Sequence, residues 1–337
     1  MQKYDNYIAV DWAQKNMAIA RLTDQAKKAD IVDVPASVAD LKIYLDNLSG
    51  TKILTIEESS TSQWLYAELS EHVNELIVCN PLRNRLLSYG PKNDTIDANK
   101  LVTLLKNNLL QPVFHSGSEY FQLRKLTSGY NSVIKNGVRL KNQRAALFIS
   151  VGKNKKRDSL ESDYEQFVLG KLDELIETND KQVDSFVTEF KKMKKTNTLI
   201  KNLTTIPGIQ ERSAVKLLAI VIDPQRFPDK GKWLSYCGLV KHEKMSGGHS
   251  YGKRSSTYSR EAKSIFKTAA MACINLCKED SPFRRYYDLL RNKGVAEYNA
   301  RHAVARRIAV ITLGIMKNNK PFEDRWEVKE KQEKTKK

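Results

Sequence analysis

The sequence lacks any uninterrupted apolar run of about 18 residues, the length that a membrane-spanning helix requires. Its first residues, MQKYDNY, lack the apolar core of a secretory signal peptide. The four cysteines show no CxxC spacing, so the pattern indicates neither a zinc ribbon nor a dithiol redox motif. We therefore expect a cytoplasmic protein with reduced cysteines and no membrane partner.

Acidic residues are missing from one long stretch, residues 135–157, which holds eight Lys and Arg and no Asp or Glu. The first 113 residues hold 12 basic and 14 acidic residues, whereas the rest of the chain holds 45 basic and 25 acidic residues. The net charge of +18 therefore arises entirely after residue 113. Such a field favours a polyanionic partner over an ordinary solvated surface, because cationic side chains neutralise backbone phosphates.

The near-neutral segment 1–113 alternates short apolar runs with helical patterns. We expect strands at 7–10, 17–22, 31–34, 53–56 and 76–79, and helices at 37–48, 61–71 and about 94–107. Ser37 stands where an N-cap residue is expected. Three strands in succession followed by alternating helices and strands predict a mixed α/β sheet covered by helices.

Four carboxylates occupy informative places in this segment. Asp11 ends the first expected strand, Glu57 ends the fourth, and Asp94 and Asp97 open the last helix three residues apart. Carboxylates that converge at strand ends and a helix start form a site for hard divalent cations. Two alternatives stay open: Asp94 also suits an N-cap, and Glu58 competes with Glu57, because adjacent strand residues face opposite ways.

Residues 114–200 carry apolar residues at spacings of three and four in two long segments joined by a basic turn at 152–157. The spacing predicts an antiparallel helical hairpin, either a coiled-coil arm or a pair of ordinary core helices. Arg144 and Asn179 place polar side chains in the expected seam.

Residues 201–325 form a third expected region, mainly α-helical, and residues 326–337 form a charged tail that we expect to be disordered. The segment LTTIPGI at 203–209 is typical of a helix–hairpin–helix, whose turn amides can hold a DNA phosphate. Residues 245–252 are expected to form a loop rich in Gly and Ser. From composition alone, Ser246 is expected to be an ordinary residue of this loop. A serine hydroxyl can, however, attack phosphorus when it is positioned and deprotonated.

In their order along the chain, these elements resemble the DEDD transposases of insertion sequences, the family that includes Piv-like DNA invertases and bridge-RNA-guided serine recombinases. The matching pieces lie between about residues 5 and 320: IAVD at 8–11, IE at 56–57, KNDTIDA at 92–98, IPGI at 206–209, Phe227, YCGL at 236–239, SGG at 246–248 and ARRIA at 305–309.

The resemblance implies an α/β RuvC-like (RNase H-like) domain at 1–113, an antiparallel coiled-coil arm at 114–200 and a mainly α-helical transposase domain at 201–325. It implies Mg²⁺, or Mn²⁺ in its place, bound by Asp11, Glu57, Asp94 and Asp97, and Ser246 as the nucleophile that becomes joined to DNA. It also implies target and donor DNA, a structured guide RNA, and a homo-oligomer, either a dimer or a tetramer, in the prokaryotic cytoplasm.

Two other functions fit the same residues. A structure-selective endonuclease of the junction-resolvase kind would use the carboxylates and water, and would form no protein–DNA adduct. A scaffold without catalytic activity would bind nucleic acid in a salt-sensitive way, and its binding would survive loss of all four acids.

Overall fold

The computed structural model describes residues 3–81, 94–117, 119–155, 158–276 and 281–324. The chain divides into two compact units, Met1–Gly117 and Ser118–Lys337. The expected disordered tail and residues 92–93 of the KNDTIDA motif lie outside the described residues. No helix in the described ranges is both long and apolar enough to cross a membrane.

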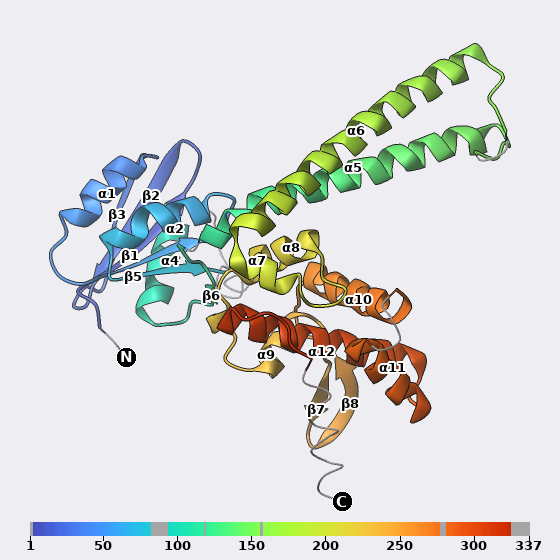
Figure 1. Ribbon diagram of the computed structural model, residues 1–337. Helices are drawn as coiled ribbons and strands as arrows, with labels where there is room; N and C mark the ends of the chain where they lie inside the picture. The colour runs from blue at the N-terminus through green and yellow to red at the C-terminus, as the bar shows by residue number, and fades with distance from the viewer. Residues whose placement is uncertain (1–2, 82–93, 118, 156–157, 277–280, 325–337) are drawn as a thin grey trace, which may run out of the picture. The chain divides into compact units, whose positions relative to one another are not determined.

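The first unit is built on a six-stranded mixed sheet with the strand order β3-β2-β1-β4-β5-β6 (Figure 1). Its strands are β1 (Asn6–Trp12), β2 (Asn16–Thr23), β3 (Asp30–Pro35), β4 (Lys52–Glu57), β5 (Glu75–Cys79) and β6 (Pro112–Val113). Strand β1 is antiparallel to β2 and parallel to β4, and β4 is parallel to β5. The strands predicted from the sequence are confirmed. Because β1 and β4 lie in the middle of the sheet, both of their faces are buried.

Helices cover both faces of the sheet. The helices of this unit are α1 (Val38–Asp46), α2 (Ser62–Leu69), the short helix η1 (Ser70–His72) and α4 (Asp94–Lys106). Ile8 and Val10 share one core with α1 and α2, whereas Tyr7 and Ala9 share the other core with α4. Alternate residues of β1 therefore point to opposite faces, as in any strand. Ser37 caps α1, since its hydroxyl accepts a hydrogen bond from the Asp40 amide at 3.2 Å.

The second unit consists of helices around one core and a two-stranded hairpin (Figure 1). Its elements are η3 (Glu119–Phe121), α5 (Leu123–Ser150), α6 (Asp163–Thr196), α7 (Thr198–Leu203), α8 (Glu211–Val221), η4 (Pro224–Arg226), α9 (Lys230–Tyr236), β7 (His242–Ser246), β8 (His249–Arg254), α10 (Arg260–Asn275), α11 (Pro282–Asn292) and α12 (Glu297–Asn318). The fully buried indole of Trp233 lies in this core and donates to the Ala309 carbonyl at 2.7 Å, which ties α9 to α12.

Helices α5 and α6 form the expected antiparallel pair (Figure 1). Where the pair joins the core, Tyr130 packs against Phe190, with ring centroids 5.2 Å apart. Further along, the polar seam residue Arg144 pairs with Asp173 at 2.6 Å, and Asn179 is buried beside Gly137. Knobs-into-holes packing of a coiled coil stays a prediction.

Candidate active site

Asp11 and Glu57 lie side by side at the carboxyl ends of two parallel strands. The register of β1 against β4 pairs Val10 with Ile56, so the next position on each strand is Asp11 and Glu57. Neighbouring strands are about 5 Å apart, so the two acids lie at adjacent places on one sheet edge. This edge is where ligand sites form in open α/β sheets.

Both acids belong to the sheet face that α4 covers. Asp11 lies two positions after Ala9, and Glu57 lies four positions after Ile53, so each acid shares a strand face with that apolar residue. Ala9 and Ile53 both lie in the core that contains α4. The alternation persists at the strand end, because Trp12 lies on the opposite face and meets Trp64 with ring centroids 5.7 Å apart. Glu58, one position after Glu57, is exposed. In an extended chain, adjacent residues face opposite sides of the sheet, so Glu58 does not share the face of Glu57.

Helix α4 runs antiparallel to β1. At its C-terminal end, the Lys106 ammonium donates to three carbonyl oxygens at the end of β2 and in the turn that follows it, at 2.9 to 3.1 Å. That turn lies beside the start of β1, because Thr23 pairs with Asn6. The first turn of α4, which carries Asp97, is therefore directed toward the end of β1 where Asp11 lies.

The described part of α4 keeps Asp97 next to the core. Ala98 is fully buried against the sheet, and Asp97 pairs with Lys100 at 3.6 Å. Asp94 is the first residue of α4, but its side chain lies outside the described residues.

Carboxylate oxygens are the donors that Mg²⁺ takes, so the donor chemistry of these four residues fits that ion. Among the described side chains, no group of three or more His, Cys, Asp and Glu is placed to hold a metal ion. Because the Asp94 side chain is outside that set, the complete quartet stays a prediction.

Ser246 lies at the tip of a β-hairpin. It is the last residue of β7 and pairs directly with His249, the first residue of β8. Gly247 and Gly248 form the two-residue turn with φ values of 56° and 79°, a conformation that glycine adopts without strain. The expectation of a loop at 245–252 is therefore wrong: the segment forms two strands and a tight turn.

The hairpin is exposed along its whole length and is anchored at its base. There His242 Nε2 lies 2.9 Å from the Ser235 hydroxyl, which is also 2.8 Å from the Ser256 hydroxyl. Every residue of both strands is exposed to solvent, so Ser246 is accessible to a large substrate such as a nucleic acid.

The helix–hairpin–helix expected at 203–209 takes the form of α7, a turn and α8. Gly208 has φ of 82°, and a Cβ at this position would lie 2.6 Å from the Ala269 carbonyl oxygen of α10. The Cys273 thiol contacts the Pro207 carbonyl oxygen at 3.0 Å. Glycine is thus required here for close packing of the turn against α10.

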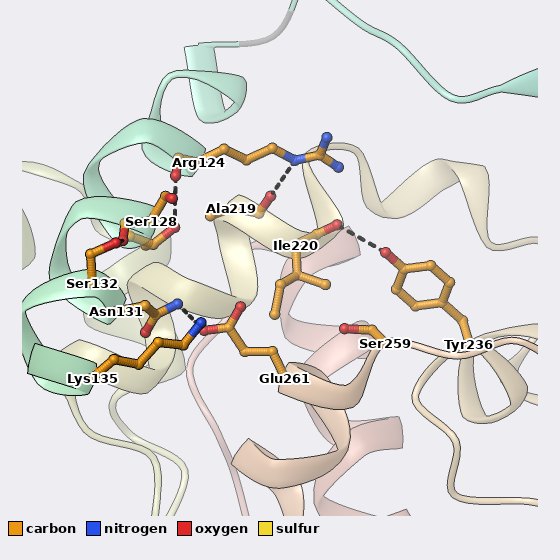
Figure 2. Close-up of a pocket in the computed structure, with 11 residues that line it drawn as sticks. Arg124, Ser128, Asn131, Ser132, Lys135, Ala219, Ile220, Tyr236, Ser259 and Glu261 are labelled. Atoms are coloured by element: carbon orange, nitrogen blue, oxygen red, sulfur yellow. Dashed lines mark hydrogen bonds between the residues drawn. The ribbon is translucent and has the colours of Figure 1, made fainter. Parts of the chain in front are cut away.

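A polar pocket of about 330 Å³ lies between α5, the end of α8 and the start of α10 (Figure 2). The Asn131 amide donates to Glu261 at 2.8 Å, and Lys216 pairs with the same carboxylate at 3.2 Å. The Tyr236 hydroxyl is directed at the Ile220 carbonyl oxygen, 3.5 Å away. Sequence reasoning missed this pocket because its lining comes from residues about a hundred positions apart.

Comparison with known proteins assigns the chain to a family. A transposase model of the DEDD type, named for IS110, matches residues 8–150. A second model, described as Transposase IS116/IS110/IS902 family, matches residues 200–288. The DEDD model implies a RuvC-like fold for the first unit, and the mixed sheet agrees with it.

Three relatives are similar over 124 residues, or 36% of this chain. An uncharacterized 43.6 kDa protein of insertion element IS110 from Streptomyces coelicolor is 31% identical over 30% of its own length. The pilin gene-inverting proteins of Moraxella lacunata and Moraxella bovis are each 27% identical over 38% of theirs. The chain thus spans less than half the length of these relatives. Since both matched segments are transposase segments of one type, in order along the chain, this protein belongs to the DEDD transposase family of insertion sequences, of the IS110 type.

Proposed function

We propose that this chain is a DNA recombinase of an insertion sequence that cuts and rejoins DNA through a covalent serine–DNA intermediate. The observation that carries the proposal is the placement of Asp11 and Glu57 on neighbouring strand ends, on the face covered by α4. The family match and the similarity to pilin gene-inverting proteins support the same reaction class.

Asp11, Glu57, Asp94 and Asp97 are the residues that would hold Mg²⁺, or Mn²⁺ in its place. When bound, the ion supplies positive charge that polarises a phosphate oxygen. The protein's part is to fix these carboxylates on a rigid sheet edge and helix start. Lys100, which pairs with Asp97 at 3.6 Å, orients that carboxylate.

Ser246 is the proposed nucleophile. Its Oγ forms a bond to phosphorus, the bond from phosphorus to one deoxyribose oxygen breaks, and the serine proton leaves while the departing oxygen gains one. The number of phosphodiester bonds is unchanged, so attack by a DNA hydroxyl on the serine linkage reseals the strand without a nucleotide cofactor.

The partners follow from charge and surface. Target and donor DNA are the substrates, and a structured guide RNA is proposed from the family resemblance and from the excess of 45 basic over 25 acidic residues after residue 113. A homo-oligomer is proposed because apolar side chains are exposed on the arm, for example Phe167 at 66% and Leu175 at 53%.

The decisive experiment traps the adduct. Wild type, Ser246→Ala and Ser250→Ala are each incubated with labelled DNA carrying the element's ends, the flanking RNA and Mg²⁺, and are then run on a denaturing gel. Ser250 is a matched control, since it lies on the same hairpin and donates to Glu243 at 2.8 Å. We expect adduct from wild type and Ser250→Ala and none from Ser246→Ala.

The other outcomes identify the competing functions. An adduct that persists in Ser246→Ala contradicts the nucleophile. Cutting without any adduct in wild type indicates an endonuclease that uses water. Salt-sensitive binding without cutting, unchanged by loss of the four acids, indicates a scaffold.

A further inference from the structure

Four cations surround a histidine on the second unit. Lys263 and Lys267 lie one turn apart on α10, and His302 and Arg306 lie one turn apart on α12, which packs against α10. Burial of the ring, followed by the charges of Lys267, Arg306, Lys263 and Lys241, lowers the pKa of His302. We call these five residues the His302 cluster.

Elsewhere in the unit, carboxylates balance several cations through ion pairs. Arg301, on the same helix, pairs with Glu297, and Lys216 pairs with Glu261 at 3.2 Å. Within the described residues, no carboxylate forms an ion pair with any of the four cations of the cluster. The Lys263 ammonium lies 4.3 Å from the centroid of the Tyr258 ring. Concentrated charge of one sign costs stability, and an anionic ligand offsets that cost.

The cluster is on the surface, apart from one buried polar atom of its histidine. Lys241 and Lys267 are exposed, and Lys263 and Arg306 are half-buried. His302 Nε2 is buried and has no hydrogen-bond partner among the described residues. Tyr298, 65% exposed, packs on the His302 ring with centroids 4.4 Å apart. An anion approaching from solvent therefore meets several cations at once.

The hairpin starts at the cluster. Lys241 immediately precedes β7, and Ser246 ends it. Five strand residues span about 17 Å, so Ser246 lies about that far from Lys241. At a rise of about 3.4 Å per base pair along the duplex axis, this corresponds to about five base pairs of axial length.

We propose that the His302 cluster binds the phosphate backbone of the DNA duplex, displaced by about five base pairs along the duplex axis from the phosphate that Ser246 attacks. The inference rests on the proposed function, which makes DNA the polyanion nearest Ser246. The interaction positions the duplex and carries no sequence information, because lysine and arginine bind phosphates of every sequence alike.

The test measures binding apart from chemistry. In a full-length Ser246→Ala background, which removes the covalent step, the pair Lys263→Gln/Lys267→Gln is compared with Lys191→Gln/Lys195→Gln. The control removes the same charge from exposed lysines of α6, which carries none of the cluster. Fluorescence anisotropy with a labelled duplex carrying the element's end gives Kd over a range of salt concentrations.

We expect the cluster variant to bind about tenfold more weakly and to lower the slope of log Kd against log salt by about two, one for each phosphate that is no longer neutralised. Lys263→Arg/Lys267→Arg should restore both, and the control should match the parent. The proposal is overturned if the cluster variant matches the parent, if the control weakens binding as much, or if binding to RNA falls while duplex binding does not. If wild type forms no adduct, the proposed function is contradicted. The Kd values of the cluster variant and the control still test whether the cluster binds the duplex.

Discussion

Asp11 and Glu57 follow the paired residues Val10 and Ile56, so they are neighbours across the parallel strands β1 and β4, on the face that α4 covers. Adjacent carboxylates at such a sheet edge repel one another unless cations neutralise them. The relationship gives each acid a position on the sheet edge that its immediate neighbour in sequence does not share.

If Glu57 holds Mg²⁺ as proposed, Glu57→Gln should lower the rate of strand cutting in Mg²⁺ about 100-fold or more, because the substitution removes a charge that binds the ion. Glu58→Gln, one residue further and exposed, should keep wild-type rates. Single-turnover cleavage of labelled DNA measures both, with duplex binding as the check on folding. Equal losses of rate in both variants, or a loss confined to Glu58→Gln, would contradict the assignment of Glu57.

Gly137→Ala and Gly170→Ala form a matched pair on the arm. A Cβ at Gly137 would lie 2.6 Å from Asn179 Nδ2, whereas no atom of the described residues lies within 4 Å of a Cβ at Gly170. Alanine in a helix stabilises by up to about 1 kcal/mol relative to glycine. Overpacking costs about 1–3 kcal/mol. Urea unfolding should therefore show Gly170→Ala stabilised and Gly137→Ala destabilised; a gain in both would mean that Asn179 moves aside freely.

Much of the first unit was predictable because its signals are local. Apolar runs bounded by turn residues marked the strands, Ser37 marked the start of α1, and strand alternation separated Glu57 from Glu58 once the register was known. Helix α4 begins at Asp94, where the sequence placed it. The positions of acids on a sheet edge thus follow from patterns within about ten residues.

Parts of the second unit could not be predicted, because their sequence patterns are weak or their residues lie far apart in the chain. The hairpin strands HEKMS and HSYGKR are wholly exposed, so they have no apolar alternation, and only the Gly247-Gly248 pair indicated a turn. The His302 cluster combines residues of α10 and α12 with Lys241, which precedes His302 by about sixty residues. Only tertiary packing brings such residues together.

Removal of exposed apolar side chains from α6 should dissociate the proposed oligomer. Tyr164, Phe167, Val168 and Leu175 recur at helical spacing and are 45–84% exposed. Phe167→Ser/Leu175→Ser should lower the mass measured by light scattering to that of a smaller species. A control, Ile43→Ser/Leu109→Ser, removes comparably exposed side chains from the first unit. An unchanged mass for the α6 variant would exclude this face as the interface.

Gly208→Ala should be more harmful than Gly294→Ala, although both glycines have φ near 80°. The left-handed conformation alone costs alanine about 1–2 kcal/mol. At Gly208 the new Cβ would also lie 2.6 Å from the backbone oxygen of Ala269, whereas Gly294 faces open space. Thermal unfolding should show a larger drop in Tm for Gly208→Ala; equal drops would indicate that α7 and α10 separate at little cost.

His302 should titrate below the ordinary histidine pKa of about 6.5 in the free protein, because burial of the ring and the four cations favour the neutral form. The stability that this shift contributes is fully present above about pH 6.5 and is lost as pH falls through the lowered folded-state pKa, because the unfolded state takes up the proton first. Wild type should therefore lose more stability on acidification than His302→Gln does, as measured by urea unfolding at a series of pH values.

Bound duplex should reverse the direction of that shift. Phosphates placed among Lys241, Lys263, Lys267 and Arg306 offset the positive field at the ring, so the His302 pKa should rise when DNA is added. Imidazole proton resonances of the full chain report all five histidines, and the signal missing from His302→Gln identifies this one. A pKa that stays constant on saturation with duplex would place the DNA backbone away from α10 and α12, since a phosphate next to the cluster cannot leave the ring's proton affinity unchanged.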